Sequence, residues 1–222
     1  LHFILHLFYT YSTLYSPTGL LKKECSYSIF YWMLPFLLIF KCFGFGGWRE
    51  ELYNRFCDFF IAYYMKPCDI FIGQSPMHNY SIRYAKRKHN AITILERGII
   101  HILEYENIMN CIKKIKVHSK SAIKRDLKGY NYPDYISVGS EQVKDSFIKN
   151  NISSSKIFVN NYGFNISHFR PTELSQKHFD LIFVGKWSII KGCKLIIELC
   201  KKRTDLTFLH VGTITDLKFP SN

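Results

Sequence analysis

The sequence predicts an α/β protein with parallel strands, and two patterns support this prediction. From residue 69 onward, short apolar segments alternate with longer segments of helical periodicity, which is typical of strand–helix–strand units. In addition, an apolar segment at 179–184 runs directly into Gly185, then into a short loop with two lysines and a helical segment. Such a bend gathers backbone amides, a helix N-terminus and cations, and therefore predicts a phosphate site.

The expected elements follow in order along the chain. We expect a strand at 1–9, an apolar helix within 24–43 and a second helix at 48–64. The second helix carries an apolar stripe at helical spacing, which we expect to face the core; it consists of Leu52, Phe56, Phe59, Phe60 and Tyr63. Further strands are expected at 69–72, 91–95, 135–138, 157–159, 179–184 and 206–211, and further helices at 75–88, 101–128, after the N-cap Ser140, and at 191–203.

The apolar segment at 24–43 leaves two interpretations open. Its uninterrupted core is shorter than the ~20 residues that span a bilayer, and Pro35 would kink a helix. Extended to Gly47, the segment takes in Lys41 and reaches a borderline length. We favour a buried or interfacial helix, and the alternative is a transmembrane span at 27–47.

The net charge bears on the class of partner, and the cysteine content bears on the compartment and on metal binding. The net charge of +13 indicates an anionic partner, namely a nucleotide phosphate, nucleic acid or an acidic membrane. The alternative is that lysine simply replaces other polar residues at the surface. No nucleic-acid motif accompanies the basic residues, so we expect no nucleic-acid partner. The seven cysteines form no C-x-x-C pair, which predicts a reducing compartment and no metal site.

Residues 162–178 lack any periodicity and contain Pro171, so they read as a linker. We expect one domain at 1–170, incomplete at its start, and the first part of a second domain at 171–222. Because the chain begins inside an apolar pattern and stops just after a strand, we expect it to be a fragment of a longer protein.

Five elements in this order resemble the retaining glycosyltransferases of the GT-B fold, the family 4 or group 1 class. They are Asp134–Ser140, Ser146-Phe147, Lys156–Val159, Tyr162–Pro171, and Phe183–Lys186 followed by Lys191-Gly192. The resemblance covers roughly residues 60–212 and implies two Rossmann-like domains, the second truncated here. The family's Gly-rich loop would lie before residue 1, and its acidic Glu-x7-Glu motif beyond Asn222.

The resemblance implies a donor diphosphate site in the second domain, formed by Gly185, Lys186, Lys191 and Gly192. The two glycines would allow close approach and tight packing, while Lys186 and Lys191 would stabilise the charge that develops on the leaving diphosphate. The chain departs from the family pattern in having Lys186 for Arg, Asn165 for Asp and Tyr162 for Asn. For Lys191-Gly192, the alternative is a solvated loop.

A second candidate site follows the strand at 91–95, because open α/β sheets bind ligands beyond the carboxyl ends of their strands. It contains Arg97, Gly98 and His101. The resemblance implies that His101 is catalytic and that Arg97 pairs with a phosphate or an acidic acceptor; the alternative is a structural histidine. We expect Gly163 to adopt a left-handed conformation at the hinge.

The implied function is transfer of a sugar from a nucleotide-sugar donor to a glycan, a lipid-linked acceptor or a small acceptor, without a metal cofactor. We expect a cytoplasmic enzyme. The basic residues of 81–128 allow two interpretations, a solvated helix face, which we favour, and contact with an anionic membrane surface. The alternative function is a basic membrane-associated or nucleic-acid-binding protein without catalytic activity. We also expect this chain alone to lack a complete donor pocket.

Overall fold

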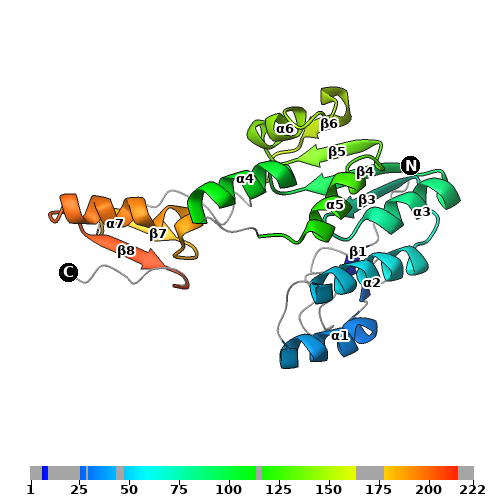
Figure 1. The fold of residues 1–222 in the computed structure, drawn as a ribbon, viewed down its shortest axis with the longest axis horizontal. Helices are drawn as coiled ribbons and strands as arrows, with labels where there is room; N and C mark the ends of the chain where they lie inside the picture. Colours follow the sequence, from blue (N-terminus) through cyan, green and yellow to red (C-terminus); the bar gives the residue numbers. More distant parts are fainter. Residues whose placement is uncertain are drawn as a thin grey trace. The chain divides into compact units, whose positions relative to one another are not determined.

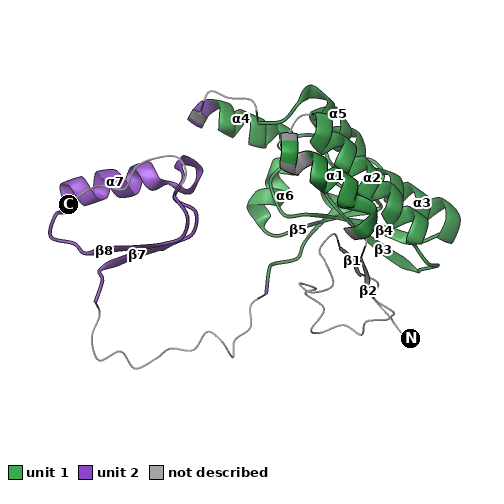
Figure 2. Cartoon of the chain, turned by 90° about the horizontal axis from the view of Figure 1, so that it is seen from below, with its two compact units in different colours: residues 1–110, 115–162 green, residues 111–114, 163–222 purple. Residues whose placement is uncertain are grey.

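The computed structural model describes residues 7–9, 26–28, 30–43, 48–113, 117–163 and 178–214, whose elements are shown in Figure 1. The chain divides into two compact units, residues 1–110 with 115–162 and residues 111–114 with 163–222 (Figure 2). All strand pairs within the described ranges are parallel. The predicted α/β class with parallel strands is therefore confirmed.

Unit 1 is built on a four-stranded sheet in the order β3-β4-β5-β6, which is compatible with a Rossmann-like domain. Its strands are β3 (Ile70–Gln74), β4 (Ile92–Arg97), β5 (Tyr135–Val138) and β6 (Ile157–Val159). Its crossovers contain α3 (Asn79–His89), α4 (Ile102–Lys113), α5 (Lys120–Gly129) and α6 (Glu141–Ile148), followed by the short turn η3 (Ser154–Lys156). Parallel neighbours require such crossovers, and the alternation of the sequence reflects them.

One face of the sheet forms the core of unit 1. The core cluster consists of Ile82, Leu95, Ile102, Tyr130, Ile136, Val138, Val143, Phe147 and Ile157. Strand side chains alternate between faces. On the other face Ser137 is buried and Ile94 is half-buried, whereas five large side chains are exposed: Ile70, Ile72, Ile92, Tyr135 and Phe158. The second face of the sheet thus carries exposed apolar side chains, whereas most parallel sheets bury both faces.

Two helices precede the sheet, α1 (Phe30–Phe43) and α2 (Trp48–Tyr64), together with a parallel pair of short strands, β1 (Leu7–Tyr9) and β2 (Ser26–Ser28). The helix expected within 24–43 therefore starts later than its apolar segment, because 26–28 form a strand. Pro35 lies inside α1. Within the described ranges, no helix has both the length and the apolar character needed to cross a membrane.

The prediction that the apolar stripe of α2 faces the core is wrong. Leu52, Phe56, Phe59 and Tyr63 are 37%, 38%, 46% and 69% exposed, and Phe60 is half-buried. The buried residues of α2 lie on its other side: Glu51, Asn54, Cys57, Asp58 and Ala62. Asp58 accepts hydrogen bonds from α3, and Glu51 pairs with Arg125 of α5. The side of α2 that packs inside unit 1 therefore combines these polar contacts with the buried Cys57 and Ala62.

Unit 2 contains the parallel pair β7 (Leu181–Val184) and β8 (Phe208–Val211), the short turn η4 (Ile189–Lys191) and helix α7 (Cys193–Lys202). Its centre is the fully buried ring of Trp187, which contacts Phe183, Phe208 and His210 at centroid distances of 5.3–5.8 Å. The strand–Gly–loop–helix order that the sequence predicts at 179–203 is confirmed.

Candidate functional site

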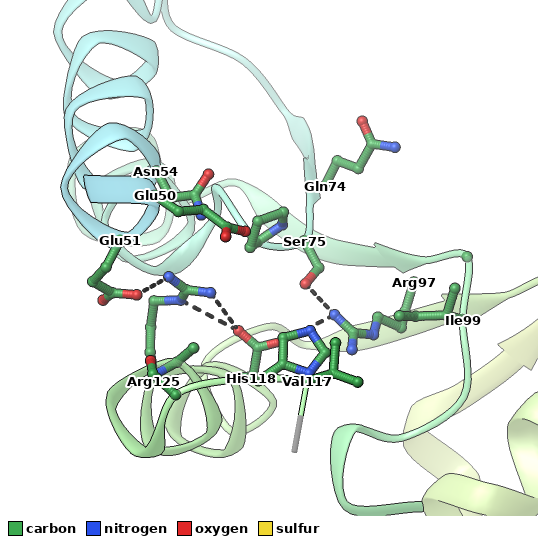
Figure 3. Close-up of a pocket in the computed structure, with 15 residues that line it drawn as sticks. Glu50, Glu51, Asn54, Gln74, Ser75, Arg97, Ile99, Val117, His118 and Arg125 are labelled. Atoms are coloured by element: carbon green, nitrogen blue, oxygen red, sulfur yellow. Dashed lines mark hydrogen bonds and ion pairs between the residues drawn. The ribbon is translucent and has the colours of Figure 1, made fainter. Parts of the chain in front are cut away.

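Unit 1 has a pocket of about 380 Å³ at the carboxyl edge of its sheet (Figure 3). Its floor is formed by the end of β3 and the end of β4, at Gln74, Ser75, Arg97 and Gly98. The first turns of α2 and the segment from Val117 to Asp126 form its walls. This is the edge at which open α/β sheets bind ligands, and Arg97 and Gly98 were both expected there from the sequence.

Arg97 is the last residue of β4 and is only 5% exposed. Its Nη1 donates to Asp126 Oδ2 at 3.0 Å and to Ser75 Oγ, and its guanidinium lies 5.7 Å from the ring centroid of Tyr130. A buried guanidinium needs an anion beside it, and Asp126 supplies one. The pair holds Arg97 at a fixed position in the floor of the pocket.

The ion pair of Arg97 continues into a chain of alternating charges. Arg125 Nη2 lies 3.1 Å from Asp126 Oδ1, and Arg125 Nη1 binds Glu51 of α2. Arg55 then pairs with the other oxygen of Glu51 at 3.0 Å. Because each buried charge has an opposite neighbour, the pocket walls are rigid without a large uncompensated desolvation cost.

A second carboxylate positions the segment that forms the outer wall. Glu106 of α4 accepts hydrogen bonds from the amides of Val117 and His118 at 3.2 Å and 2.9 Å, and from the His118 ring at 2.7 Å. Partial burial alone would raise the pKa of Glu106, but these hydrogen bonds outweigh it and lower the pKa. His118 therefore lines the pocket with its ring oriented by a carboxylate, an arrangement suited to proton transfer.

The structure does not bring His101 to the pocket. The imidazole is 1% exposed and packs between Tyr130 and Phe147, with ring centroids 5.0 Å and 5.1 Å away. Burial, reinforced by the charge of Arg97, lowers the pKa of His101 to about 4. The ring is thus a neutral part of the core.

Gly163 is exposed, and a Cβ added there would meet nothing within 4 Å. Its φ lies outside the left-handed region, in contrast to Gly185, Gly192 and Gly212. The expectation of a left-handed conformation at Gly163 is therefore wrong. Any L-residue can occupy this position without strain.

In unit 2, Gly185 and Gly192 have the conformations for which glycine is needed, with φ of 138° and 82°. The Gly185 carbonyl accepts a hydrogen bond from His210 Nε2 at 2.8 Å. A Cβ at Gly212 would overlap the Gly185 carbonyl. The two strands thus end on a close backbone contact, and Gly212 and His210 are members of this bend that sequence reasoning missed.

The two lysines expected to hold a diphosphate are both exposed in unit 2. The amides of Lys191, Gly192 and Cys193 donate to the carbonyls of Ser188 and Ile189, so these three amides close the η4 turn. An anion at this bend would therefore meet the ammonium groups of Lys186 and Lys191 rather than these three amides.

No protein-family model matches the chain, and no curated protein matches it. Within the described ranges, no group of three or more His, Cys, Asp or Glu side chains could hold a metal ion. The resemblance to glycosyltransferases therefore stays a prediction from the sequence, and the geometry of the two units is what bears on function.

Proposed function

We propose that the chain is part of an enzyme that transfers a sugar from a nucleotide-sugar donor to a hydroxyl-bearing acceptor, as GT-B glycosyltransferases do. The observation that carries the proposal is the pocket of unit 1. It lies where α/β sheets bind ligands, and its lining is rich in groups that bind hydroxyls.

The pocket offers hydrogen-bond acceptors and donors close together. Glu50 and the side-chain oxygens of Asn54 and Gln74 can accept, while Arg97 and Ser119 can donate. A sugar hydroxyl both donates and accepts, so neighbouring hydroxyls need such mixed partners. Since buried ion pairs already fix Arg97 and Arg125, little ordering would be needed when a polyhydroxylated acceptor binds.

Each unit would contribute a function of its own, with the acceptor bound by unit 1 and the diphosphate of the donor bound by unit 2. The carboxylate-oriented ring of His118 would accept the proton that the attacking hydroxyl gives up. Lys186 and Lys191 would neutralise the diphosphate that departs from the donor sugar, because fixed cations stabilise charge that develops in the transition state.

The donor role is tested by calorimetric titration of the 222-residue chain with UDP, GDP and ADP and with their hexose conjugates. We expect binding of at least one nucleotide, weakened about tenfold in Lys191→Ala and in Lys186→Ala, since a charge-assisted hydrogen bond contributes about 1.5–3 kcal/mol.

The matched control is Lys201→Ala, which removes an exposed lysine from the last turn of α7 in the same unit. We expect this variant to bind like the wild type. Equal affinity in all three variants would contradict the assigned roles of Lys186 and Lys191. Tight binding of RNA or DNA at physiological salt, with a steep decrease as salt rises, would instead favour a nucleic-acid partner.

A further inference from the structure

Three helices of unit 1 expose a large apolar surface, which we call the aromatic face. Its exposed residues are Tyr31, Trp32, Leu34, Leu38 and Ile39 of α1, Trp48, Leu52, Phe56, Phe59 and Tyr63 of α2, and Tyr80 of α3. α1, α2 and α3 lie side by side in both views (Figures 1 and 2). Contiguous apolar patches of this kind mark interaction sites on soluble domains.

Ring contacts make the aromatic face continuous across the three helices. Trp32 of α1 stacks on Phe60 of α2 at a centroid distance of 5.5 Å, and Phe36 lies 4.6 Å from Phe56. Phe59 of α2 in turn lies 5.9 Å from Tyr80 of α3. The exposed rings are thus supported from below by other rings and form one surface.

The described side chains on the outer side of α1 are mostly apolar. Tyr31, Leu34, Pro35 and Leu38 follow one another at helical spacing and are all exposed, while Met33 is the buried residue among the described side chains of this helix. A helix that is apolar around its circumference is expected to be covered by protein or lipid. α1 is too short to span a bilayer, so lipid could cover it only from the surface.

The charges around the aromatic face have one sign. α1 and α3 contain no Asp or Glu, and the carboxylates of Glu51 and Asp58 on α2 are buried on its inner side. The last turn of α3 carries exposed Arg87 and Lys88. A surface of this composition complements anionic lipid headgroups.

We propose that the aromatic face docks on an anionic lipid bilayer, with α1 lying in the plane of the headgroups. Tryptophan and tyrosine favour the interface between headgroups and acyl chains, and Trp32, Trp48, Tyr31 and Tyr63 are the most exposed rings of this face. Cations beside an amphipathic helix add attraction to anionic lipid. Two copies of the face packed together would instead bring like charges near one another, which disfavours a second copy as its partner.

The proposal is tested by flotation of the full chain with vesicles. We expect it to float with vesicles containing about one-third phosphatidylglycerol, and far less with pure phosphatidylcholine. Leu34→Glu/Leu38→Glu should reduce flotation at least tenfold. The matched control is Leu195→Glu/Leu199→Glu, which alters a pair of exposed leucines at the same spacing on α7 and should float like the wild type.

The cationic contribution is tested separately. Arg87→Ala/Lys88→Ala should weaken binding to the anionic vesicles about tenfold or more, since each basic residue near such a surface contributes about fivefold. Lys201→Ala/Lys202→Ala removes an equivalent pair from the last turn of α7 and should leave binding unchanged. Equal losses in both pairs would mean that net charge alone drives binding, and would overturn the assignment to the aromatic face.

Fluorescence provides a readout that leaves the charge of α1 unchanged. Lipids with brominated acyl chains should quench the exposed Trp32 and Trp48, and should not quench the buried Trp187. Trp32→Phe/Trp48→Phe should therefore abolish quenching while leaving the fold intact by circular dichroism. Absence of quenching in the wild type, or a dimer that Leu34→Glu/Leu38→Glu dissociates, would assign this face to a protein partner and overturn the proposal.

Discussion

At the scale of single residues, the closest packing beside the pocket is around Gly129, the last residue of α5. A Cβ there would lie 2.5 Å from Nε2 of the fully buried His78, and closer still to Asn79 Oδ1. The Asn79 side chain is itself held by a hydrogen bond from its Nδ2 to the Arg125 carbonyl at 3.0 Å. Neither neighbour can move freely, so glycine is needed at this position for space.

We therefore predict that Gly129→Ala lowers the free energy of unfolding by about 1–3 kcal/mol, the usual cost of forcing extra atoms into a packed core. Urea denaturation followed by circular dichroism measures the change. Gly163→Ala is the matched control, because nothing lies within 4 Å of its added Cβ, and we expect it to stay within about 0.5 kcal/mol of the wild type. Equal stability of the two variants would contradict this account.

Of the residues that line the pocket, Arg97 and Gly98 could be predicted from the sequence. Arg97 and Gly98 follow an apolar strand, and the ends of parallel strands share one edge of a sheet, so their position was accessible to pattern reasoning. Glu51 and Arg125 were not accessible, because they are 74 residues apart and meet only through the packing of α2 and α5. His101 shows the opposite error: a residue near a strand end can still turn its ring into the core.

At the scale of elements, α2 and α3 are joined by a buried carboxylate. Asp58 of α2 accepts hydrogen bonds from the amides of Tyr80 and Ser81 at 2.6 Å and 2.9 Å, and from the Ser81 hydroxyl at 2.6 Å. His78, the residue before α3, makes no capping hydrogen bond of its own with its side chain. A residue of one helix thus caps the N-terminus of another.

We predict that Asp58→Ala destabilises unit 1 by about 2–3 kcal/mol, because it leaves two amides and a hydroxyl without their acceptor in a buried site. Hydrogen exchange should show lost protection at Tyr80 and Ser81, and urea denaturation gives the free energy. Asp58→Asn retains one acceptor oxygen, so its free energy of unfolding should lie between those of the wild type and Asp58→Ala. Asp205→Ala removes an exposed carboxylate paired with Arg203 and should unfold at the same urea concentration as the wild type.

The elements also show where periodicity is reliable and where it is not. The strand at Tyr135–Val138 has the bounds that its apolar pattern predicts. The helix expected over 101–128 is divided instead into α4 and α5. Glu106 holds the amides at Val117 and His118, and Ser119 caps α5 by accepting from the Ala122 amide at 3.2 Å. Hydrophobic periodicity does not predict such side-chain caps, although a serine directly before a helical segment is a recognisable N-cap signal.

At the scale of the whole molecule, the sequence identifies the α/β class because strand and helix periods alternate over most of its length. No local sequence pattern predicts that the aromatic face and the second face of the four-stranded sheet are exposed. An apolar stripe predicts burial, but whether the chain itself covers that stripe depends on tertiary contacts. The aromatic stripe of α2 is the example, since the other side of this helix packs inside unit 1.

The stability of unit 1 as a whole should depend on two buried histidines. Burial lowers the pKa of His78 to about 4; the charge of Asp126 opposes this shift, and the charges of Arg97 and Arg125 add to it. Burial and the charge of Arg97 lower the pKa of His101 to about 4. In the unfolded chain both rings have ordinary pKa values near 6.5. Between these values the unfolded chain binds more protons, so stability must fall as the pH decreases.

We predict that the stabilisation from the neutral rings is complete above about pH 6.5 and is lost progressively down to about pH 4, with each histidine contributing about 3 kcal/mol. Urea denaturation at a series of pH values between 7.5 and 4.5 measures the slope. His101→Leu fills the same apolar space without a titrating group and should reduce the slope by about half. Because linkage fixes the sign, a wild-type stability that stays constant or rises on acidification over this range would show that the two rings are not held neutral in the core.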